Sequence, residues 1–400
     1  MKISVLGLGY IGLPTSIILA KAGHDVYGFD VNKEVIKKLG TGKIHIIENN
    51  LQEAYEEVLK DKKFKAYSQL QKADVYIIAV PTPFKREHKE KVADLSYVFS
   101  ATEIVAKVLK EGSLVILEST VPPKTTRKMT DILVEKTGIN RDKFFTAHCP
   151  ERVLPGRILY EIEHNDRVIG AERKESAQMA KDLYDTFVKE GTNYVTDDIT
   201  AEMCKLVENT SRDVNIAFAN ELSIICDKLD IDVFELIELA NKHPRVNILN
   251  PGVGVGGHCI AVDPWFLVEK FPQESKLIHT ARKRNDFKPT WIADKVEEKI
   301  KKDKSLTIGI LGLAYKANVD DLRESPSIEL AHILQERGYK VIGCEPYSEE
   351  SEIKRIKNIS LDEVLKKSNY VVLTLAHNEF KENLQKIEKK NIFNCIKISR

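Results

Sequence analysis

A cysteine at the end of a glycine-rich loop is the first group in this sequence that suggests covalent chemistry. Cys259 follows the segment Gly254–Gly257, whose small side chains let a substrate approach the backbone. His258 and Asp263 lie near enough in the sequence to influence the thiolate, which is the nucleophilic form of cysteine. Most cysteines are small buried apolar residues, and that interpretation suits Cys226 in its apolar periodic segment. It suits Cys259 poorly, because no apolar neighbours shelter it on its N-terminal side.

A second set of polar groups lies on a segment without proline or glycine, residues 200–229. Lys205 and Asn209 are four residues apart and Arg212 is three further on, so all three project from one face of a helix. Beside a nucleophilic cysteine, an ammonium and a carboxamide would stabilise an alkoxide or a tetrahedral oxyanion. The alternative is that this stripe is only the solvated side of the helix.

The opening of the chain carries the spacing of a dinucleotide-binding turn. Gly7, Gly9 and Gly12 follow an apolar strand and open a helix, and Asp30 ends the next strand. Such glycines let backbone N–H groups approach a pyrophosphate, and the acidic residue accepts hydrogen bonds from the adenosine ribose while repelling a 2′-phosphate. The pattern predicts NAD as cofactor in preference to NADP. A signal peptide would also begin with a lysine and an apolar run, but it would not need glycines in this register.

Two threonines follow further strands of the same region. Thr82 lies in Val-Pro-Thr-Pro, and Thr120 follows Leu-Glu-Ser. Ligands of doubly wound sheets bind at the carboxyl ends of the strands, so both positions are candidate contacts. Threonines there also cap helices, which is the alternative for each.

Alternating strands and helices must position these groups. Short β-rich runs separated by amphipathic stretches predict a parallel sheet covered on both faces, ending near residue 198. The expected strands are 3–6, 25–29, 75–80, 114–117, 144–147, 167–170 and 193–195, and the expected helices between them are 13–22, 97–109 and 125–137. A helix over 200–229 would be about 45 Å long and would link domains and form a subunit interface. Further helices are expected at 232–241 and 275–301.

The last hundred residues repeat the opening plan. The segment TIGILGLAYK…YKVIGCEP parallels ISVLGLGYIG…HDVYGFD, with Gly312 in the place of Gly7. Ala314 and Ala317 replace the second and third glycines, and an insertion lies around residues 318–326. We therefore expect an α/β protein with an NAD-binding domain at 1–198, a helical region with the cysteine at 199–300, and a second Rossmann-like domain for another phosphate-bearing ligand at 301–400.

Composition excludes several classes of function. The net charge is +1, from 61 basic and 60 acidic residues, so no general field favours nucleic acid or membrane. The six cysteines are scattered without a C-x-x-C pair, so we expect reduced thiols and no metal site. Without an apolar run of about 20 residues, no bilayer span is expected. A cytoplasmic enzyme is the resulting prediction.

Several short segments of this sequence together resemble the UDP-glucose/GDP-mannose dehydrogenase family along essentially the whole chain. The matching strings are GLGYIGLP, VPTP, the strand end at Thr120, PERVLPGR, the helix with Lys205 and Asn209, PGVGVGGHC and Tyr315-Lys316…Arg323-Glu-Ser-Pro. PERVLPGR, HPRVN and GGHCIAVDP look most like the branch that acts on UDP-N-acetylmannosamine, beside the one that acts on UDP-N-acetylglucosamine.

The resemblance implies a role for each matching residue. Cys259 would trap the intermediate aldehyde and carry a thioester, Lys205 would donate a proton and stabilise the oxyanion, and Asn209 would assist it. Asp263 and Glu151 are candidates for handling protons and water. The implied NAD contacts are Tyr10, Ile11, Asp30, Thr82, Thr120 and Arg323, in addition to the glycine turn. The implied substrate contacts are Arg152, Val153, Lys205, Asn209, Arg212, Gly256, Tyr315 and Lys316, with His243 and Arg245 contributed by the same or a second subunit.

Two departures separate this chain from the UDP-glucose branch. Val262 stands where that branch usually has a lysine, and Pro155 stands where it usually has a second glutamate. Both argue against UDP-glucose as substrate. A dehydrogenase that transfers a single hydride without a covalent step is one rival interpretation, and a catalytically idle nucleotide-binding regulator is another. The expected chemistry is a four-electron oxidation that yields two NADH per sugar.

Overall fold

The computed structural model describes residues 1–85, 91–154, 156–257 and 259–397. These residues form two compact units, Met1–Val207 and Glu208–Arg400, and the boundary falls inside the long helix α8 (Asp198–Leu229). The expectations for Pro155 and His258 lie outside the described residues.

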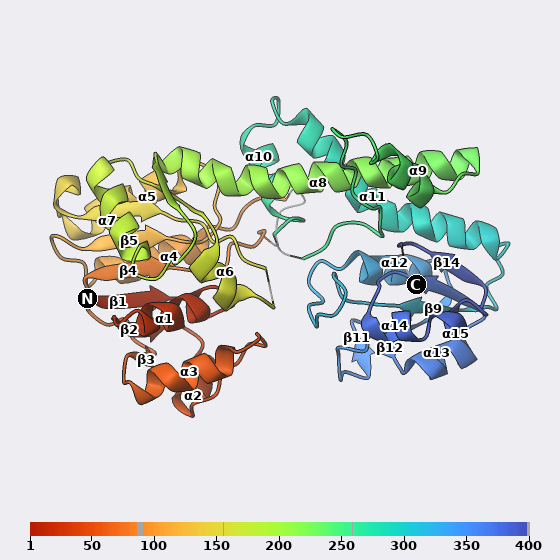
Figure 1. The fold of residues 1–400 in the computed structure, drawn as a ribbon, viewed down its shortest axis with the longest axis horizontal. Coiled ribbons are helices and arrows are strands. Elements are labelled where there is room, and N and C mark those ends of the chain that lie inside the picture. The colour runs from red at the N-terminus through yellow and green to blue at the C-terminus, as the bar shows by residue number, and fades with distance from the viewer. Residues whose placement is uncertain (86–90, 155, 258, 398–400) are drawn as a thin grey trace. The chain divides into compact units, whose positions relative to one another are not determined.

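The first unit is built on an 8-stranded sheet with the order β3-β2-β1-β4-β5-β6-β7-β8 (Figure 1). Every neighbouring pair is parallel except β6 and β7. The strands are β1 (Lys2–Leu6), β2 (Asp25–Phe29), β3 (Phe64–Tyr67), β4 (Val75–Ile78), β5 (Leu114–Leu117), β6 (Phe145–His148), β7 (Arg167–Gly170) and β8 (Asn193–Thr196).

Helices cover both faces of this sheet. One face packs against α1 and α7 around residues such as Ile17 and Leu183, and the other packs against α4 and α5 around Val105 and Met129. The helices are α1 (Gly12–Lys21), α2 (Lys33–Gly40), α3 (Leu51–Lys60), α4 (Ser96–Ala106), α5 (Thr125–Thr137), α6 (Ile158–His164) and α7 (Lys174–Tyr184), with a 3₁₀ turn at Arg141–Lys143. The predicted doubly wound α/β fold is confirmed.

The start of α8 is anchored to α5 by two buried carboxylates. Asp198 accepts two hydrogen bonds from Arg127, at 2.9 and 3.0 Å. One turn later, Glu202 accepts hydrogen bonds from the backbone N–H and the hydroxyl of Thr126, both at 2.7 Å, and from the N–H of Lys124 at 2.5 Å. Three donors at the N-terminus of α5 thus satisfy a carboxylate that has no exposed surface. The long helix begins at Asp198, two residues earlier than predicted.

The second unit contains the rest of α8 and a 6-stranded sheet of order β11-β12-β10-β9-β13-β14, parallel apart from β11 and β12. Its strands are β9 (Thr307–Leu311), β10 (Lys340–Cys344), β11 (Glu352–Ile353), β12 (Ile356–Asn358), β13 (Tyr370–Leu373) and β14 (Ile392–Asn394). Its further helices are α9 (Val233–Ala240), α10 (Asp263–Lys270), α11 (Lys276–Lys299), α12 (Pro326–Glu336), α13 (Leu361–Lys367), α14 (Asn378–Glu382) and α15 (Leu384–Ile387). Helices α11 and α12 cover one face of this sheet and α13 and α15 the other, so it too is Rossmann-like, as predicted.

A buried polar cluster joins α8 to α11 within this unit. Arg282 is 1% exposed and forms an ion pair with the buried Asp213. Asn285 donates to Asp213 at 2.8 Å and accepts from Asn220 at 2.9 Å. Asn220 also accepts a hydrogen bond from the N–H of Gly252 at 2.9 Å, so this cluster fixes the start of the glycine-rich segment.

Candidate functional site

The glycine turn of the first unit fits a dinucleotide pyrophosphate. Gly7 has φ +91°, and a Cβ there would lie 2.6 Å from the carbonyl oxygen of Ala79. A Cβ on Gly12 would lie 1.8 Å from the oxygen of Gly7, whereas one on Gly9 would meet nothing within 4 Å. The two outer glycines therefore close the turn, and the middle one leaves its outer side open. No side chain caps α1 at Ile11, so the helix N-terminus is available to an anion.

Asp30 lies directly after β2, as the sequence predicts. One of its carboxylate oxygens accepts a hydrogen bond from the N–H of Leu8 at 2.9 Å, and the other accepts one from Asn32 at 2.8 Å. These bonds hold a partly exposed carboxylate beside the glycine turn. A carboxylate in this place suits ribose hydroxyls and repels an added phosphate.

The segments that carry Thr82 and Thr120 come after the adjacent strands β4 and β5. The hydroxyl of Ser119 donates to the carbonyl of Val80 at 2.7 Å, which ties the two segments together. Both threonines are partly buried at the carboxyl edge of the sheet. Tyr10 and Ile11, also partly buried, lie in the glycine turn at the same edge.

Glu151 lies in a buried ionic cluster after β6. Its carboxylate is bonded to Arg167 at 2.9 Å and to the N–H of Arg152 at 2.8 Å, and the residue is 6% exposed. The Arg167 guanidinium packs over the ring of Tyr184, with its Cζ atom 4.9 Å from the ring centroid. Arg152 and Val153 are more exposed, and the carbonyl of Arg152 accepts a hydrogen bond from Asn165 at 2.7 Å.

The sequence interpretation missed Glu118 in the same cluster. Its carboxyl accepts a hydrogen bond from the hydroxyl of Tyr184 at 2.7 Å and is fully enclosed. Burial, together with the nearby charge of Glu151, raises the pKa of Glu118 to about 7, while Arg167 opposes that shift. An acidic residue directly after the apolar strand β5 was the available signal.

The loop before Cys259 packs tightly on the segment that contains Tyr315. A Cβ on Gly256 would lie 2.6 Å from the oxygen of Glu324 and 2.7 Å from the Cβ of Tyr315. Gly257 has φ +76°, and its N–H donates to the carbonyl of Arg323 at 3.0 Å. The close approach of this loop to the 315–324 segment, together with the positive φ of Gly257, is enough to require glycine at both positions.

Cys259 is exposed at the end of that loop. Its carbonyl accepts hydrogen bonds from Val262 at 3.0 Å and from Asp263 at 2.8 Å, which start helix α10. The Asp263 side chain is 3% exposed and accepts a hydrogen bond from the Asn209 amide at 2.5 Å. Asn209 is thereby linked to the helix that begins four residues after the thiol. Lys205 is one turn earlier on α8, at the end of the first unit, and is partly buried.

The remaining candidate substrate residues lie in different parts of the second unit. Lys316 is exposed in the loop after β9, and Arg323, in the same loop, pairs with Asp321 at 2.6 Å. His243 and Arg245 are exposed on the turn after α9, where the N–H of Arg245 donates to His243 at 3.4 Å. Arg212 is exposed on α8. In the described parts of the chain, no group of three or more His, Cys, Asp or Glu side chains has the arrangement of a metal site.

A dinucleotide turn, an exposed thiol on a glycine loop and a second Rossmann-like sheet fit the dehydrogenase family that the sequence resembles. The chain belongs to the UDP-glucose/GDP-mannose dehydrogenase family. Residues 1–188 match the NAD binding domain of that family, residues 199–287 its central domain and residues 309–398 its UDP binding domain.

Known proteins are similar over nearly the whole chain. A UDP-N-acetyl-D-mannosamine dehydrogenase from Campylobacter jejuni is 46% identical, over 95% of this chain and 96% of its own. An NDP-N-acetyl-D-galactosaminuronic acid dehydrogenase from Ralstonia nicotianae is 44% identical, over 95% of this chain and 92% of its own. The solved structure of a UDP-D-ManNAc dehydrogenase from Pyrococcus horikoshii superposes with a TM-score of 0.93 at 41% identity, covering 100% of this chain and 96% of that one.

These findings confirm the predicted family, the fold class and NAD as cofactor. The chain is an NAD-dependent UDP-sugar dehydrogenase. None of the described helices combines the length and apolar character needed to cross a bilayer.

Proposed function

We propose that this enzyme oxidises UDP-N-acetyl-D-mannosamine at C6 to the uronic acid, with two NADH formed per sugar. The observation that carries the proposal is the exposed thiol of Cys259 on a loop whose glycines pack against Tyr315 of the UDP binding domain. Relatives with this substrate in their names, over 40% identical along the chain, support the choice of sugar.

The proposed chemistry balances as two oxidations and one hydrolysis. Two NAD molecules are consumed in turn, and each, when bound, would accept the hydride of one oxidation. The C6 alcohol loses a hydride and a proton to give an aldehyde, and the Cys259 thiolate adds to its carbonyl carbon as a hemithioacetal. Loss of a second hydride and a proton gives the thioester. Water then adds to the thioester, the carbon–sulfur bond breaks, and the products are the carboxylate and the free thiol.

The other catalytic residues are assigned according to where negative charge develops on the substrate oxygen during the reaction. Lys205 stabilises the alkoxide and the tetrahedral oxyanion and donates the proton, and Asn209 adds a second donor. The hydrogen bond from Asn209 to Asp263 supports this role because it orients the amide. Asp263 and Glu151 remain our candidates for moving protons and water.

The binding roles are proposals of the same kind. We assign NAD to Gly7, Gly9, Tyr10, Ile11, Gly12, Asp30, Thr82, Thr120 and Arg323. We assign the UDP-sugar to Arg152, Val153, Lys205, Asn209, Arg212, His243, Arg245, Gly256, Tyr315 and Lys316. The domain division at 1–198, 199–300 and 301–400 also remains a proposal.

NADH stoichiometry with a panel of sugars tests the reaction. The enzyme is given limiting UDP conjugates of N-acetylmannosamine, N-acetylglucosamine, N-acetylgalactosamine and glucose, and NADH and uronate are counted. We expect two NADH per sugar and the highest kcat/KM for the N-acetylmannosamine conjugate. One NADH per sugar would instead support a dehydrogenase that transfers a single hydride without a covalent step. No turnover of any sugar would support a catalytically idle nucleotide-binding regulator. The galacto compound belongs in the panel because a relative at 44% identity is named for the galacto sugar acid.

Substitution of Cys259 tests the covalent step. Cys259→Ala should form no uronate, whereas Cys259→Ser should become trapped as a slowly hydrolysed ester that mass spectrometry detects on the chain. The matched control is Cys204→Ala, which removes a partly buried thiol on α8 and should leave turnover intact. Full uronate production by Cys259→Ala would exclude the thioester.

We also propose that the enzyme is a cytoplasmic homodimer, or a larger homo-oligomer, that assembles through the 200–229 helix. The support is a row of exposed apolar side chains on α8, with Phe218 51%, Ile225 47% and Leu229 64% exposed. Apolar side chains exposed in such a row cost free energy in water, and packing against a second copy of this chain would bury them. Light scattering of the unaltered chain and of Phe218→Glu, which should lower the mass, provides the test.

A further inference from the structure

The acidic residue directly after β10 is buried and binds the backbone of neighbouring loops. Glu345 occupies the position that Asp30 holds after β2, but it is only 2% exposed. One carboxylate oxygen accepts hydrogen bonds from the N–H groups of Leu313 at 2.7 Å and Ala314 at 2.8 Å. The other accepts from the N–H of Tyr347 at 3.2 Å. Both oxygens thus bind backbone, as those of Asp30 do, but Glu345 is buried and so is not accessible to a ribose hydroxyl. Its bonds instead hold the loop after β9.

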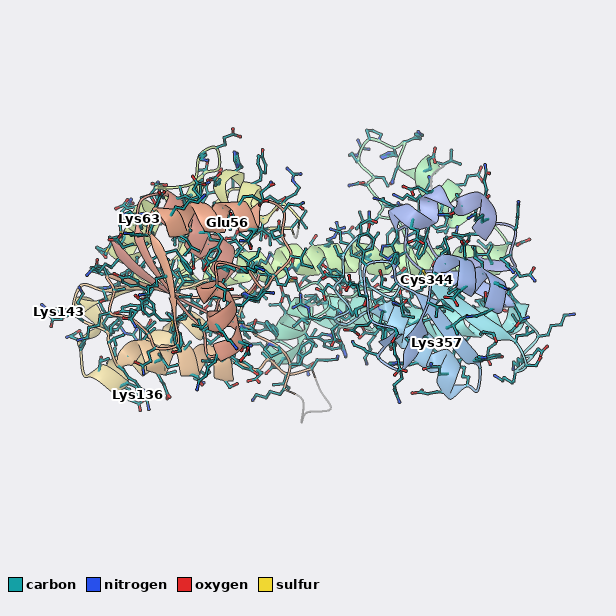
Figure 2. The ribbon with its side chains drawn as sticks, turned by 90° about the horizontal axis from the view of Figure 1, so that it is seen from below. Glu56, Lys63, Lys136, Lys143, Cys344 and Lys357 are labelled. Atoms are coloured by element: carbon teal, nitrogen blue, oxygen red, sulfur yellow. The ribbon has the colours of Figure 1, made fainter. Side chains whose placement is uncertain are left out.

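A buried histidine holds the same loop further along. His377 comes after β13, has no exposed surface, and its Nδ1 accepts a hydrogen bond from the N–H of Asn318 at 2.9 Å. Because Nδ1 is the acceptor, the ring proton lies on Nε2, which is 3.3 Å from the Glu345 carboxylate. Burial tends to raise the pKa of Glu345, but the nearby His377 ring and the hydrogen bonds from the loop N–H groups outweigh it, so the pKa is lowered. Figure 2 labels Cys344, the last residue of β10, which directly precedes Glu345.

Asn318 itself is fixed from three sides. It has φ +62°, in the left-handed region. Its side-chain oxygen accepts from the N–H of Asn378 at 2.9 Å and from the hydroxyl of Tyr347 at 3.1 Å. The Tyr347 ring stacks on His377, with centroids 5.1 Å apart. A strained residue held by this many partners indicates that the loop conformation matters.

We propose that Glu345 and His377 are positioning residues that clamp both ends of the 313–318 segment and thereby place Tyr315 and Lys316 for the diphosphate of the nucleotide sugar. This inference rests on the proposed substrate contacts of that segment. Glu345 holds residues 313 and 314, and His377 holds residue 318, so Tyr315 and Lys316 lie between two anchored ends. In this segment Ala314 and Ala317 stand where the dinucleotide turn has its second and third glycines.

Calorimetric titration of the full-length enzyme with UDP and, separately, with NAD tests the clamp. His377→Ala removes the acceptor for Asn318 and should weaken UDP binding about tenfold, while NAD affinity stays within about twofold. His377→Asn places an amide oxygen near Nδ1 and should restore most of the UDP affinity. In steady state, the KM for the nucleotide sugar should rise with the UDP dissociation constant while kcat stays nearly constant.

A second variant covers the case in which His377→Ala does not fold. Asn318→Gly keeps the left-handed backbone, removes the bonds to Asn378 and Tyr347, and should weaken UDP binding by about threefold to tenfold. UDP affinity that is unchanged in the folded variants, or that falls equally with NAD affinity, would overturn the positioning role alone. Absence of UDP binding by the unaltered enzyme would overturn the nucleotide contacts of the proposed function, and the clamp with them.

Discussion

The two Rossmann-like sheets of this chain use one plan in two ways. In both, the first glycine has a positive φ, +91° at Gly7 and +97° at Gly312, and its N–H donates at 2.9 Å to the last residue of the next strand. In both, a leucine after that glycine packs where a strand glycine leaves room. A Cβ on Gly28 would lie 2.9 Å from Leu8, and one on Gly343 would lie 2.7 Å from Leu313.

The two sheets differ in the segment that comes after the turn. In the first sheet, α1 begins at Gly12 without a side-chain cap, so the helix N-terminus can face a pyrophosphate. In the second, a loop intervenes, and α12 begins at Pro326 with Ser325 as its cap. A capped helix has fewer N–H groups to offer, so a ligand there must be bound by the loop. The same strand and turn arrangement therefore offers a ligand site at a helix N-terminus in the first sheet and a ligand site on a loop in the second.

The largest effect on ligand binding should come from disrupting the first glycine turn. Gly12→Ala places a Cβ 1.8 Å from the oxygen of Gly7, so the turn must open. We expect the NAD dissociation constant to rise by about 100-fold, the upper range for overpacking of a rigid site. Ala317→Gly, at the corresponding position of the second turn, is the matched control and should change UDP affinity by less than about threefold. Comparable losses in the two titrations would show that the turns are equivalent.

A second comparison concerns the two buried carboxyls. The pKa of Glu118 is raised to about 7 from an ordinary value of 4.5, so the stability it contributes is full below pH 4.5 and is lost as the pH rises through 7. The pKa of Glu345 is lowered, so its contribution is present above the ordinary value and is lost as the pH falls through its folded value. The two residues therefore have opposite pH dependences.

Chemical denaturation at several pH values measures this contrast. Glu118→Gln keeps an acceptor for Tyr184 and should gain stability relative to the unaltered protein between pH 5 and 8, by up to about 3 kcal/mol. Glu345→Gln should lose stability at pH 7, and its deficit should shrink on acidification. If the stability differences of the two variants changed with pH in the same direction, the opposite pKa shifts of Glu118 and Glu345 would be contradicted.

Cofactor choice gives a smaller effect. Asp30 is partly exposed and Glu345 is buried, so only Asp30 can repel the 2′-phosphate of NADP. Asp30→Ala should narrow the ratio of kcat/KM for NAD over NADP by about tenfold. Glu345→Gln should leave the ratio unchanged. Similar kcat/KM values for the two cofactors in the unaltered enzyme would refute this role for Asp30.

The smallest effect should come from the cap of α12. The Ser325 hydroxyl accepts a hydrogen bond from the N–H of Ile328 at 3.4 Å and donates to the carbonyl of Ala314 at 3.2 Å. Ser325→Ala should lower the free energy of unfolding by about 1 kcal/mol. Ser327→Ala is the control, because the Ser327 hydroxyl is buried without a hydrogen bond. Equal losses from both substitutions would mean that the cap contributes nothing.

The buried strands were predictable because they are continuous apolar runs. The strand at 114–117 was placed correctly, and the one at 144–147 was displaced by one residue. The elements that the sequence did not predict include α2, α3 and β3 in the first unit and α10 and most of the elements after β10 in the second. Helix α2 buries only Leu39 completely, and β3 is a short edge strand with one fully buried residue, Phe64, so their periodicity is weak.

The partners of the candidate site residues were harder to predict than the residues themselves. Cys259, Lys205 and Asn209 stand out by residue type and spacing. The bond from Asn209 to Asp263 joins residues 54 apart in the sequence, and the anchoring of Asn318 by His377 joins residues 59 apart. Such pairings depend on which strand ends and helices meet, and local patterns carry no signal for that. The buried ion pair between Arg282 and Asp213 could not be predicted from the sequence for the same reason.

The anchoring of α8 by α5 bears on how the chain can be cut. Fragments for crystallisation or NMR are commonly ended where a domain match ends, which here is residue 188. Such a fragment would lack the edge strand β8 and also Asp198 and Glu202, leaving Arg127 and the N-terminus of α5 without their acceptors. A fragment ending at Val207 keeps both carboxylates and coincides with the end of the first compact unit. The soluble yield of the NAD-binding part should therefore depend on β8 and on the first turns of a helix that mostly belongs, by sequence match, to the central domain.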